Sequence, residues 1–143
     1  MPRGNILVSL NERHANNIFA GTKRVELRRR TMNVRAGALM WIYVKLPVGK
    51  IVGRAQIMTI DIASPETLWN KHSFVSGLTY SEFFEYFSGV DQAVALVLED
   101  CQKLTQAITL NELRASLGSF HPPQFFAHLL DGDPLLAAVH RAA

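Results

Sequence analysis

The sequence is poor in the residues that hold many small proteins together by covalent bonds or metal ions. Its 143 residues include one cysteine, Cys101, which excludes an internal disulfide framework and a zinc site with paired thiolates. The five histidines are widely spaced, and no two stand at the separation typical of metal ligands. We therefore expect no metal site and no organic cofactor.

Long apolar runs and low-complexity tracts are also missing. Hydrophobic residues make up 48% of the chain and charged residues 19%, a composition that excludes a disordered or fibrous class. Residues 1–10 carry one arginine and alternating apolar residues, rather than the apolar core of a signal peptide or a membrane span. We therefore expect a cytoplasmic globular protein without membrane association, folded as one domain over residues 1–143.

Positive charge is concentrated in one segment. Residues 21–35 contain six basic residues: Lys23, Arg24, Arg28, Arg29, Arg30 and Arg35. Glu26 is the one acid among them, so this segment carries +5, whereas the 15 basic and 12 acidic residues of the whole chain sum to +3. A field confined to one segment predicts a local anionic partner; the alternative is a solvated run of surface arginines.

Hydrophobic periodicity and capping residues predict an α+β order of elements. Alternation predicts strands at residues 6–10, 23–28, 38–45, 50–63 and 91–104, with a bulge at Gly53 and a hairpin joining the third strand to the fourth. Capping signals predict helices at residues 12–20, ending at Gly21, at 65–72 and at 79–87, and a further helix start at Thr109.

The carboxyl-terminal part of the sequence is less patterned. Prolines break the chain at residues 121–124, and we expect the apolar stretch 125–130 to begin the last helix. Residues 131–143 are expected to form a short helix or a frayed tail beyond a core of about residues 5–130. These elements together predict a small β-barrel of α+β type with inserted helices.

Strand alternation places two site candidates on one face of the strand predicted at residues 23–28. Val25 and Leu27 point to one face, and Glu26 and Arg28 point to the other. Strict alternation places Lys23 with Val25, so Lys23 joins the polar pair only if the preceding glycine turn twists the entry to the strand.

The basic segment resembles a known signature. Gly21, Lys23, Glu26 and Arg28 match all four fixed positions of G-x-K-x-x-E-x-R, the signature of the ASCH domain, a branch of the PUA-like superfamily of small barrels. Residues 41–44 and 47–53 resemble the hairpin of this family. Residues 65–69 and 122–125 resemble a bacterial subgroup described as predicted transcriptional regulators. The likeness runs from residue 6 to about residue 129.

The resemblance implies a PUA-like barrel whose cleft, beside the signature strand, faces RNA or a nucleotide. Some branches of the family are described as ribonucleases or RNA-binding coregulators, and one is an amidohydrolase that removes acetyl from N4-acetylcytidine. In that amidohydrolase branch the signature lysine is the nucleophile or base, a threonine replaces the glutamate, and a second acid follows the inserted helix. Here Glu26 stands at the threonine position and residues 76–77 are Ser and Gly, so only Lys23 matches.

The predicted nucleic-acid-binding site comprises eight residues: Lys23, Arg24, Glu26, Arg28, Arg29, Arg30, Tyr43 and Lys45. Lys23 would bind phosphate as a point charge, and Arg28 would bind it as a planar fork. Glu26 would either orient one of these cations or act directly on a base edge or in proton transfer.

An aromatic contact is predicted from the strand at residues 38–45. Tyr43 and Lys45 alternate on one face together with Trp41, where a ring would stack on a base beside a phosphate contact. The alternative is that both rings belong to the core.

Three functions agree with these residues. The first is an RNA- or nucleotide-binding domain with a basic cleft and a regulatory role. The second is a metal-independent hydrolase, a ribonuclease or an N4-acetylcytidine amidohydrolase, with Lys23 and Glu26 as catalytic residues. The third is a protein-interaction module in transcriptional regulation, whose arginines bind an acidic partner. The sequence leaves the oligomeric state open.

Overall fold

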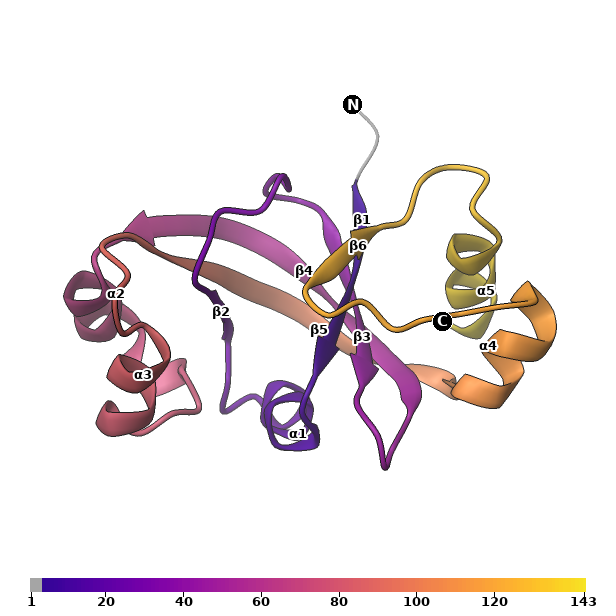
Figure 1. Ribbon diagram of the computed structural model, residues 1–143, viewed down its shortest axis with the longest axis horizontal. Coiled ribbons are helices and arrows are strands. Elements are labelled where there is room, and N and C mark those ends of the chain that lie inside the picture. Colours follow the sequence, from indigo (N-terminus) through magenta and orange to yellow (C-terminus); the bar gives the residue numbers. More distant parts are fainter. Residues whose placement is uncertain (1–3) are drawn as a thin grey trace.

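The computed structural model describes residues 4–143 (Figure 1). It shows a strongly curved mixed β-sheet with helices packed at both ends. The first three residues of the predicted domain 1–143 lie outside the described part. The strands are β1 (Asn5–Leu10), β2 (Val25–Arg28), β3 (Leu39–Val44), β4 (Lys50–Ala63), β5 (Ala93–Thr109) and β6 (Phe126–His128). The helices are α1 (Glu12–Ala20), α2 (Pro65–His72), α3 (Tyr80–Tyr86), α4 (Leu110–Leu117) and α5 (Pro134–Ala142), with a 3₁₀ turn, η1 (Ser73–Val75).

The sheet has the strand order β2-β5-β4-β3-β1-β6. Strands β1 and β3 are parallel, and all other neighbours are antiparallel. Figure 1 shows α2 and α3 at one end of the long strands β4 and β5, and α4 and α5 at the other. The sheet curls into a half-barrel, which confirms the predicted α+β PUA-like fold. In residues 4–143 the edge strands β2 and β6 are not hydrogen-bonded to each other, so the expected closure of the strands is incomplete.

Local sequence signals account for the helices in the first two thirds of the chain. Helix α1 ends at Gly21, whose φ of 84° is left-handed and whose N–H bonds the carbonyls of Asn17 and Ile18. Helix α3 begins with a complete capping box between Thr79 and Glu82. The predicted helices at residues 12–20, 65–72 and 79–87 are therefore confirmed to within one residue at each end.

The predicted hairpin is formed by β3 and β4, and the predicted irregularity at Gly53 is confirmed. The register of β4 against β5 shifts between Ile51 and Gly53. A Cβ atom at position 53 would lie 2.5 Å from the carbonyl oxygen of Gln102 and 2.5 Å from the ring of Phe19. Only glycine allows this close approach of the chains.

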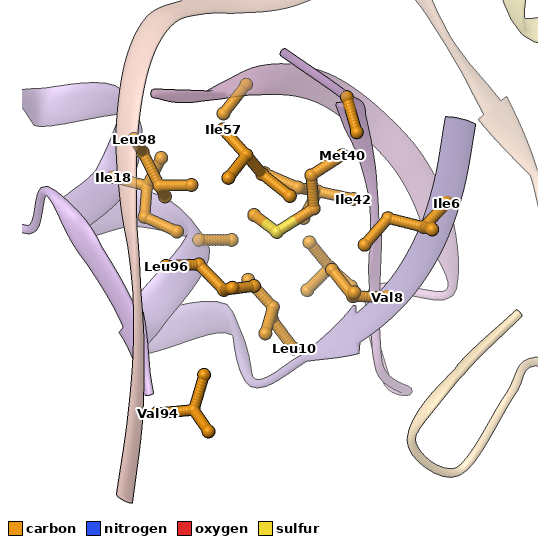
Figure 2. Close-up of a cluster of buried hydrophobic side chains, with 14 residues drawn as sticks. Ile6, Val8, Leu10, Ile18, Met40, Ile42, Ile57, Val94, Leu96 and Leu98 are labelled. Carbon is orange, nitrogen blue, oxygen red and sulfur yellow. The ribbon is translucent and has the colours of Figure 1, made fainter. Parts of the chain in front are cut away.

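The core occupies both faces of the sheet. On the concave face, side chains from β1, β3, β4 and β5 point toward one another and toward Ile18 of α1 (Figure 2). On the opposite face, Trp41 and Tyr43 of β3 pack with α4 and α5, which contribute Leu113 and Leu136. Because both faces are covered, all six residues of β3 are buried.

The structure corrects one prediction for the carboxyl-terminal part and decides between two alternatives for another. Residues 125–130 do not begin a helix, because Phe126 pairs with Val8 and residues 126–128 form an antiparallel edge strand against β1. The tail is not frayed: Asp133 caps α5, and the buried side chains of Leu136 and Val139 fix this helix on the core. The short-helix alternative for residues 131–143 is thereby confirmed.

Candidate functional site

A cleft of about 530 Å³ lies where the signature segment, residues 21–28, meets α1, α3 and the residues preceding β6. Four polar or charged side chains are buried in residues 4–143: Ser9, Lys23, Glu26 and Ser76. The first three line this cleft, and Ser76 is hydrogen-bonded to Lys23 through its carbonyl oxygen. The buried polar side chains of the described chain are thus gathered at one place.

Lys23 is the most deeply buried cation of the cleft, with 2% of its surface exposed. It precedes β2, which begins at Val25, so strand alternation does not govern its direction. Its Nζ donates a hydrogen bond to the carbonyl oxygen of Ser76 at 2.5 Å, and Gly77 packs against its methylene chain. Burial lowers the pKa of the Lys23 ammonium, and the nearby carboxylate of Glu26 opposes that shift in part.

Glu26 and Arg28 form a nearly buried ion pair on one face of β2. The carboxylate Oε2 of Glu26 accepts from Nη2 of Arg28 at 3.2 Å, and Oε1 accepts from the backbone N–H of Leu27 at 3.0 Å. The other terminal nitrogen of Arg28, Nη1, donates to the carbonyl oxygen of Phe125 at 3.1 Å. Arg28 therefore joins β2 to the segment before β6, across the open side of the half-barrel.

The rim of the cleft is closed by an ion pair between α1 and α3. Both terminal nitrogens of Arg13 donate to the carboxylate of Glu82, at 2.5 and 3.0 Å, and Nη2 also donates to the carbonyl oxygen of Gly77 at 3.0 Å. The bonds from Arg13, followed by those from Thr79, lower the pKa of the Glu82 carboxyl to about 2. Glu82 is accordingly ionised at neutral pH and does not serve as a proton donor there.

His14, beside Arg13 on α1, also lines the cleft. Its Nδ1 atom is buried and has no hydrogen-bond partner in residues 4–143. Burial, and after it the charge of Lys23, lowers the pKa of the imidazole. His14 is therefore a neutral imidazole at neutral pH, a form that accepts protons.

Two aromatic side chains border the cleft. The Tyr86 hydroxyl donates to the carbonyl oxygen of Leu27 at 3.1 Å, and burial, followed by the charge of Glu26, raises the pKa of this phenol. Phe125, in the segment that precedes β6, also lines the cleft, and 67% of its surface is exposed. Neither ring was predicted as a site residue, because each comes from a segment far from the signature in the sequence.

The structure divides the eight predicted site residues into three groups. Lys23, Glu26, Arg28 and Lys45 line the cleft together. The three other predicted arginines are exposed and lie outside the cleft lining: Arg24, Arg29 and Arg30. Tyr43 lies in the core and forms the third group.

Tyr43 and Trp41 are not available to stack on a base. Tyr43 is 2% exposed and its ring packs edge-on against Phe120, with 6.2 Å between centroids. Trp41 is fully buried and donates through Nε1 to the side chain of Asn5. Both rings face α4 and α5, which cover this face of β3, so the prediction of an aromatic contact at these two positions is wrong.

A second hollow, of about 600 Å³, lies at the other end of β1 beside Gly4, Arg35 and His128. None of its lining residues is a buried charged side chain. Arg35, the last basic residue of the +5 segment, lies here and not in the cleft. The desolvated charges distinguish the cleft at Lys23 as the chemically specialised site.

Two kinds of feature are absent from residues 4–143. No group of three or more His, Cys, Asp or Glu side chains is placed to hold a metal ion there. In the same residues no helix combines the length and the apolar character needed to cross a membrane.

Comparison with known proteins places this geometry in context. The profile of the ASCH domain matches residues 8–110. An "ASCH domain-containing ribonuclease" of Zymomonas mobilis is 33% identical over 122 residues, which cover 85% of this chain and 82% of that protein. A crystal structure of ASCH from Zymomonas mobilis superposes with a TM-score of 0.87 at 30% identity, covering 96% of this chain and 95% of the other.

A more distant structure shares the fold alone. The N-terminal domain of McrB from Staphylothermus marinus superposes with a TM-score of 0.61 at 11% identity, covering 100% of this chain and 99% of the other.

Proposed function

Because this chain belongs to the ASCH domain family, we propose that its cleft binds single-stranded RNA through the sugar–phosphate backbone. The observation that carries this proposal is the collection of the buried polar side chains Ser9, Lys23 and Glu26 in one cleft. Burying charge costs free energy unless it is compensated, and an apolar core would be at least as stable. Such costly groups are typical of functional sites.

The cations of the cleft retain donors for phosphate. Arg28 has five N–H donors and uses one at Nη1 and one at Nη2, and Lys23 uses one of three. Lys45 adds positive charge at the rim, where the charge of Arg13 is balanced by Glu82. Glu26 has both carboxylate oxygens occupied, so its proposed role is to orient Arg28 rather than to contact RNA directly.

The size of the cleft favours a single strand. A volume of about 530 Å³ is typical of a site for one small ligand and accommodates a nucleotide rather than a duplex. Unpaired nucleotides also expose their bases and backbone to protein side chains, whereas the major groove of an RNA duplex is closed to them.

A second candidate function, RNA cleavage, is favoured by the neutral imidazole and the buried amine. His14 or the deprotonated amine of Lys23 would take the proton of a ribose 2′-hydroxyl, whose oxygen would attack the adjacent phosphorus. The bond from phosphorus to the 5′-oxygen would break, and the leaving oxygen would take a proton from water, giving a 2′,3′-cyclic phosphate and a 5′-hydroxyl. Arg28 would stabilise the charge that develops on the phosphate oxygens. The relative described as a ribonuclease supports this candidate.

The amidohydrolase reading has less support. Residues 76 and 77 present a backbone carbonyl to Lys23 and carry no carboxylate. The regulatory role inferred from the bacterial subgroup stays a prediction.

Binding is tested by fluorescence anisotropy with a labelled oligoadenylate of about ten nucleotides, carrying 2′-O-methyl groups that prevent cleavage. Arg28→Ala should raise Kd about 10- to 150-fold, the loss of a charge-assisted hydrogen bond. Arg141→Ala, which removes an exposed arginine of α5 outside the cleft, should leave Kd unchanged. Equal affinities for wild type and Arg28→Ala would reject the phosphate-binding cleft.

Cleavage is tested with the unmodified oligonucleotide, once with chelator and once with a divalent cation. Wild type should yield the cyclic-phosphate product in both, and Lys23→Arg should lower the rate because arginine does not deprotonate. Intact RNA under both conditions would reject cleavage and leave binding as the function. Product formed only with the cation would reject the metal-independent mechanism.

A further inference from the structure

We infer that Phe125 is a base-stacking residue. One nucleobase of the bound RNA would lie on its ring while a nearby phosphate of the same RNA contacts Arg28 and Lys23. This inference rests on the proposed binding of RNA and extends it from the backbone to the base. Phe125 lines the same cleft as the two cations, and 67% of its surface is exposed. Single-stranded RNA is commonly bound by this combination of a cationic groove and an aromatic face.

The backbone that carries Phe125 is held in place on both sides. The hydroxyl of Ser9 donates to the carbonyl oxygen of Pro123 at 2.6 Å, and Arg28 donates to the carbonyl oxygen of Phe125 at 3.1 Å. Pro122 and Pro123 further restrict the chain, because each fixes its own φ. The exposed phenyl ring is therefore mounted on a constrained segment, which lowers the entropic cost of stacking.

Arg28 sets the distance between the two parts of the proposed subsite. The same guanidinium bonds the carboxylate of Glu26 and the carbonyl of Phe125. A phosphate at Arg28 and a base on Phe125 would thus belong to one nucleotide or to neighbouring nucleotides.

Gln124 adds a group for the edge of the base. It is exposed, lines the cleft, and its side-chain amide has no hydrogen-bond partner in residues 4–143. An amide has two donors and one acceptor and pairs with the hydrogen-bonding edges of bases. Tyr86 lies at the same cleft, where its hydroxyl is held by the carbonyl of Leu27.

The experiment compares three variants with 2′-O-methyl oligoadenylate and oligouridylate. Phe125→Ala should raise Kd for the oligoadenylate about 5- to 150-fold. The increase should be smaller for oligouridylate, since the smaller pyrimidine stacks less strongly. Phe125→Tyr keeps the ring and should keep the affinity. Phe74→Ala removes an aromatic ring that is 96% exposed and outside the cleft lining, and it should change nothing.

A second readout follows stacking directly. A 2-aminopurine in the oligoadenylate should lose fluorescence on binding wild type and retain it with Phe125→Ala. The thermal midpoint of each variant checks that the fold is intact. If Phe125→Ala binds both oligonucleotides like wild type while Arg28→Ala does not, the stacking role is overturned and RNA binding stands. If wild type binds neither, the proposed function fails, and this inference fails with it. A dimer that Phe125→Ala converts to monomer, with RNA affinity unchanged, would instead assign Phe125 to a contact between two copies.

Discussion

Replacing Lys23 with methionine separates the functional role of this lysine from a structural one. Methionine has nearly the same length and no charge, so it fills the space that Lys23 occupies under Gly77. Burying an ammonium group costs several kcal/mol of desolvation, a cost that the apolar methionine side chain avoids. Loss of the donor to the Ser76 carbonyl costs about 1–3 kcal/mol.

The two terms offset each other, so Lys23→Met should change the free energy of unfolding by no more than about 2 kcal/mol at neutral pH. RNA affinity should behave differently. The variant lacks a cation that we propose contacts phosphate, so Kd should rise about 10- to 150-fold. Urea denaturation gives the first quantity and anisotropy gives the second. Lys71→Met, at an exposed lysine of α2 outside the cleft, is the matched control.

The pH dependence of stability, compared between wild type and Lys23→Met, tests whether burial causes the pKa shift of Lys23. Burial holds the pKa of Lys23 in the folded protein below its ordinary value of 10.5. Between these two pKa values the unfolded chain binds more protons than the folded one, so stability rises with pH there. Wild type should therefore gain stability relative to Lys23→Met as the pH rises toward 10.5. A loss of more than about 4 kcal/mol in the variant, or an unchanged Kd, would refute a functional Lys23.

Three further changes test the packing around the cleft. Glu26→Gln weakens the ion pair with Arg28 and should lower the free energy of unfolding by about 1–3 kcal/mol in urea; equal stability would show that the pair contributes nothing. Glu82→Gln should be less stable than wild type above pH 4.5. The difference should vanish as the pH falls to about 2, because the folded-state pKa is depressed by Arg13; a difference independent of pH in thermal scans would contradict this. Phe83→Ala, in the core between α3 and the sheet, should cost about 3–5 kcal/mol while RNA affinity persists below the lowered midpoint; a loss of affinity in the folded variant would show that the core and the cleft are coupled.

Elements with local signals were predictable from the sequence. The spacing of apolar residues and Gly21 predict the helix from Glu12 to Ala20, and the capping box predicts α3. Strand β6 has no such signal. Its backbone conformation depends on pairing with β1, more than a hundred residues earlier in the chain, and this tertiary contact overrides the local preference.

The face that a strand presents to solvent was harder to predict. Alternation separates the two faces of β3, but it does not show that α4 and α5 cover the face that carries Tyr43. The same limit applied to Lys23, whose direction depends on the residue at which β2 begins. Of the eight predicted site residues, four line the cleft and four do not.

No pattern in the sequence predicted which residues distant segments contribute to the cleft. Arg13 and His14 come from α1, and Phe125 reaches the cleft because β6 is the edge strand next to β1. Knowledge of the fold is needed before these side chains can be grouped. The signature itself did identify the buried centre, Lys23 and Glu26.

The location of RNA on the protein is measured most directly by titrating ¹⁵N-labelled protein with the 2′-O-methyl oligoadenylate and following each backbone amide by NMR. Chemical shifts should change at residues 9–14, 23–28 and 124–126, the segments that contribute to the cleft lining. Amides of α4 and α5, on the opposite face of β3, should stay unchanged. Saturable shifts confined to α4 and α5, with none in the three cleft segments, would contradict RNA binding at Lys23 and Arg28.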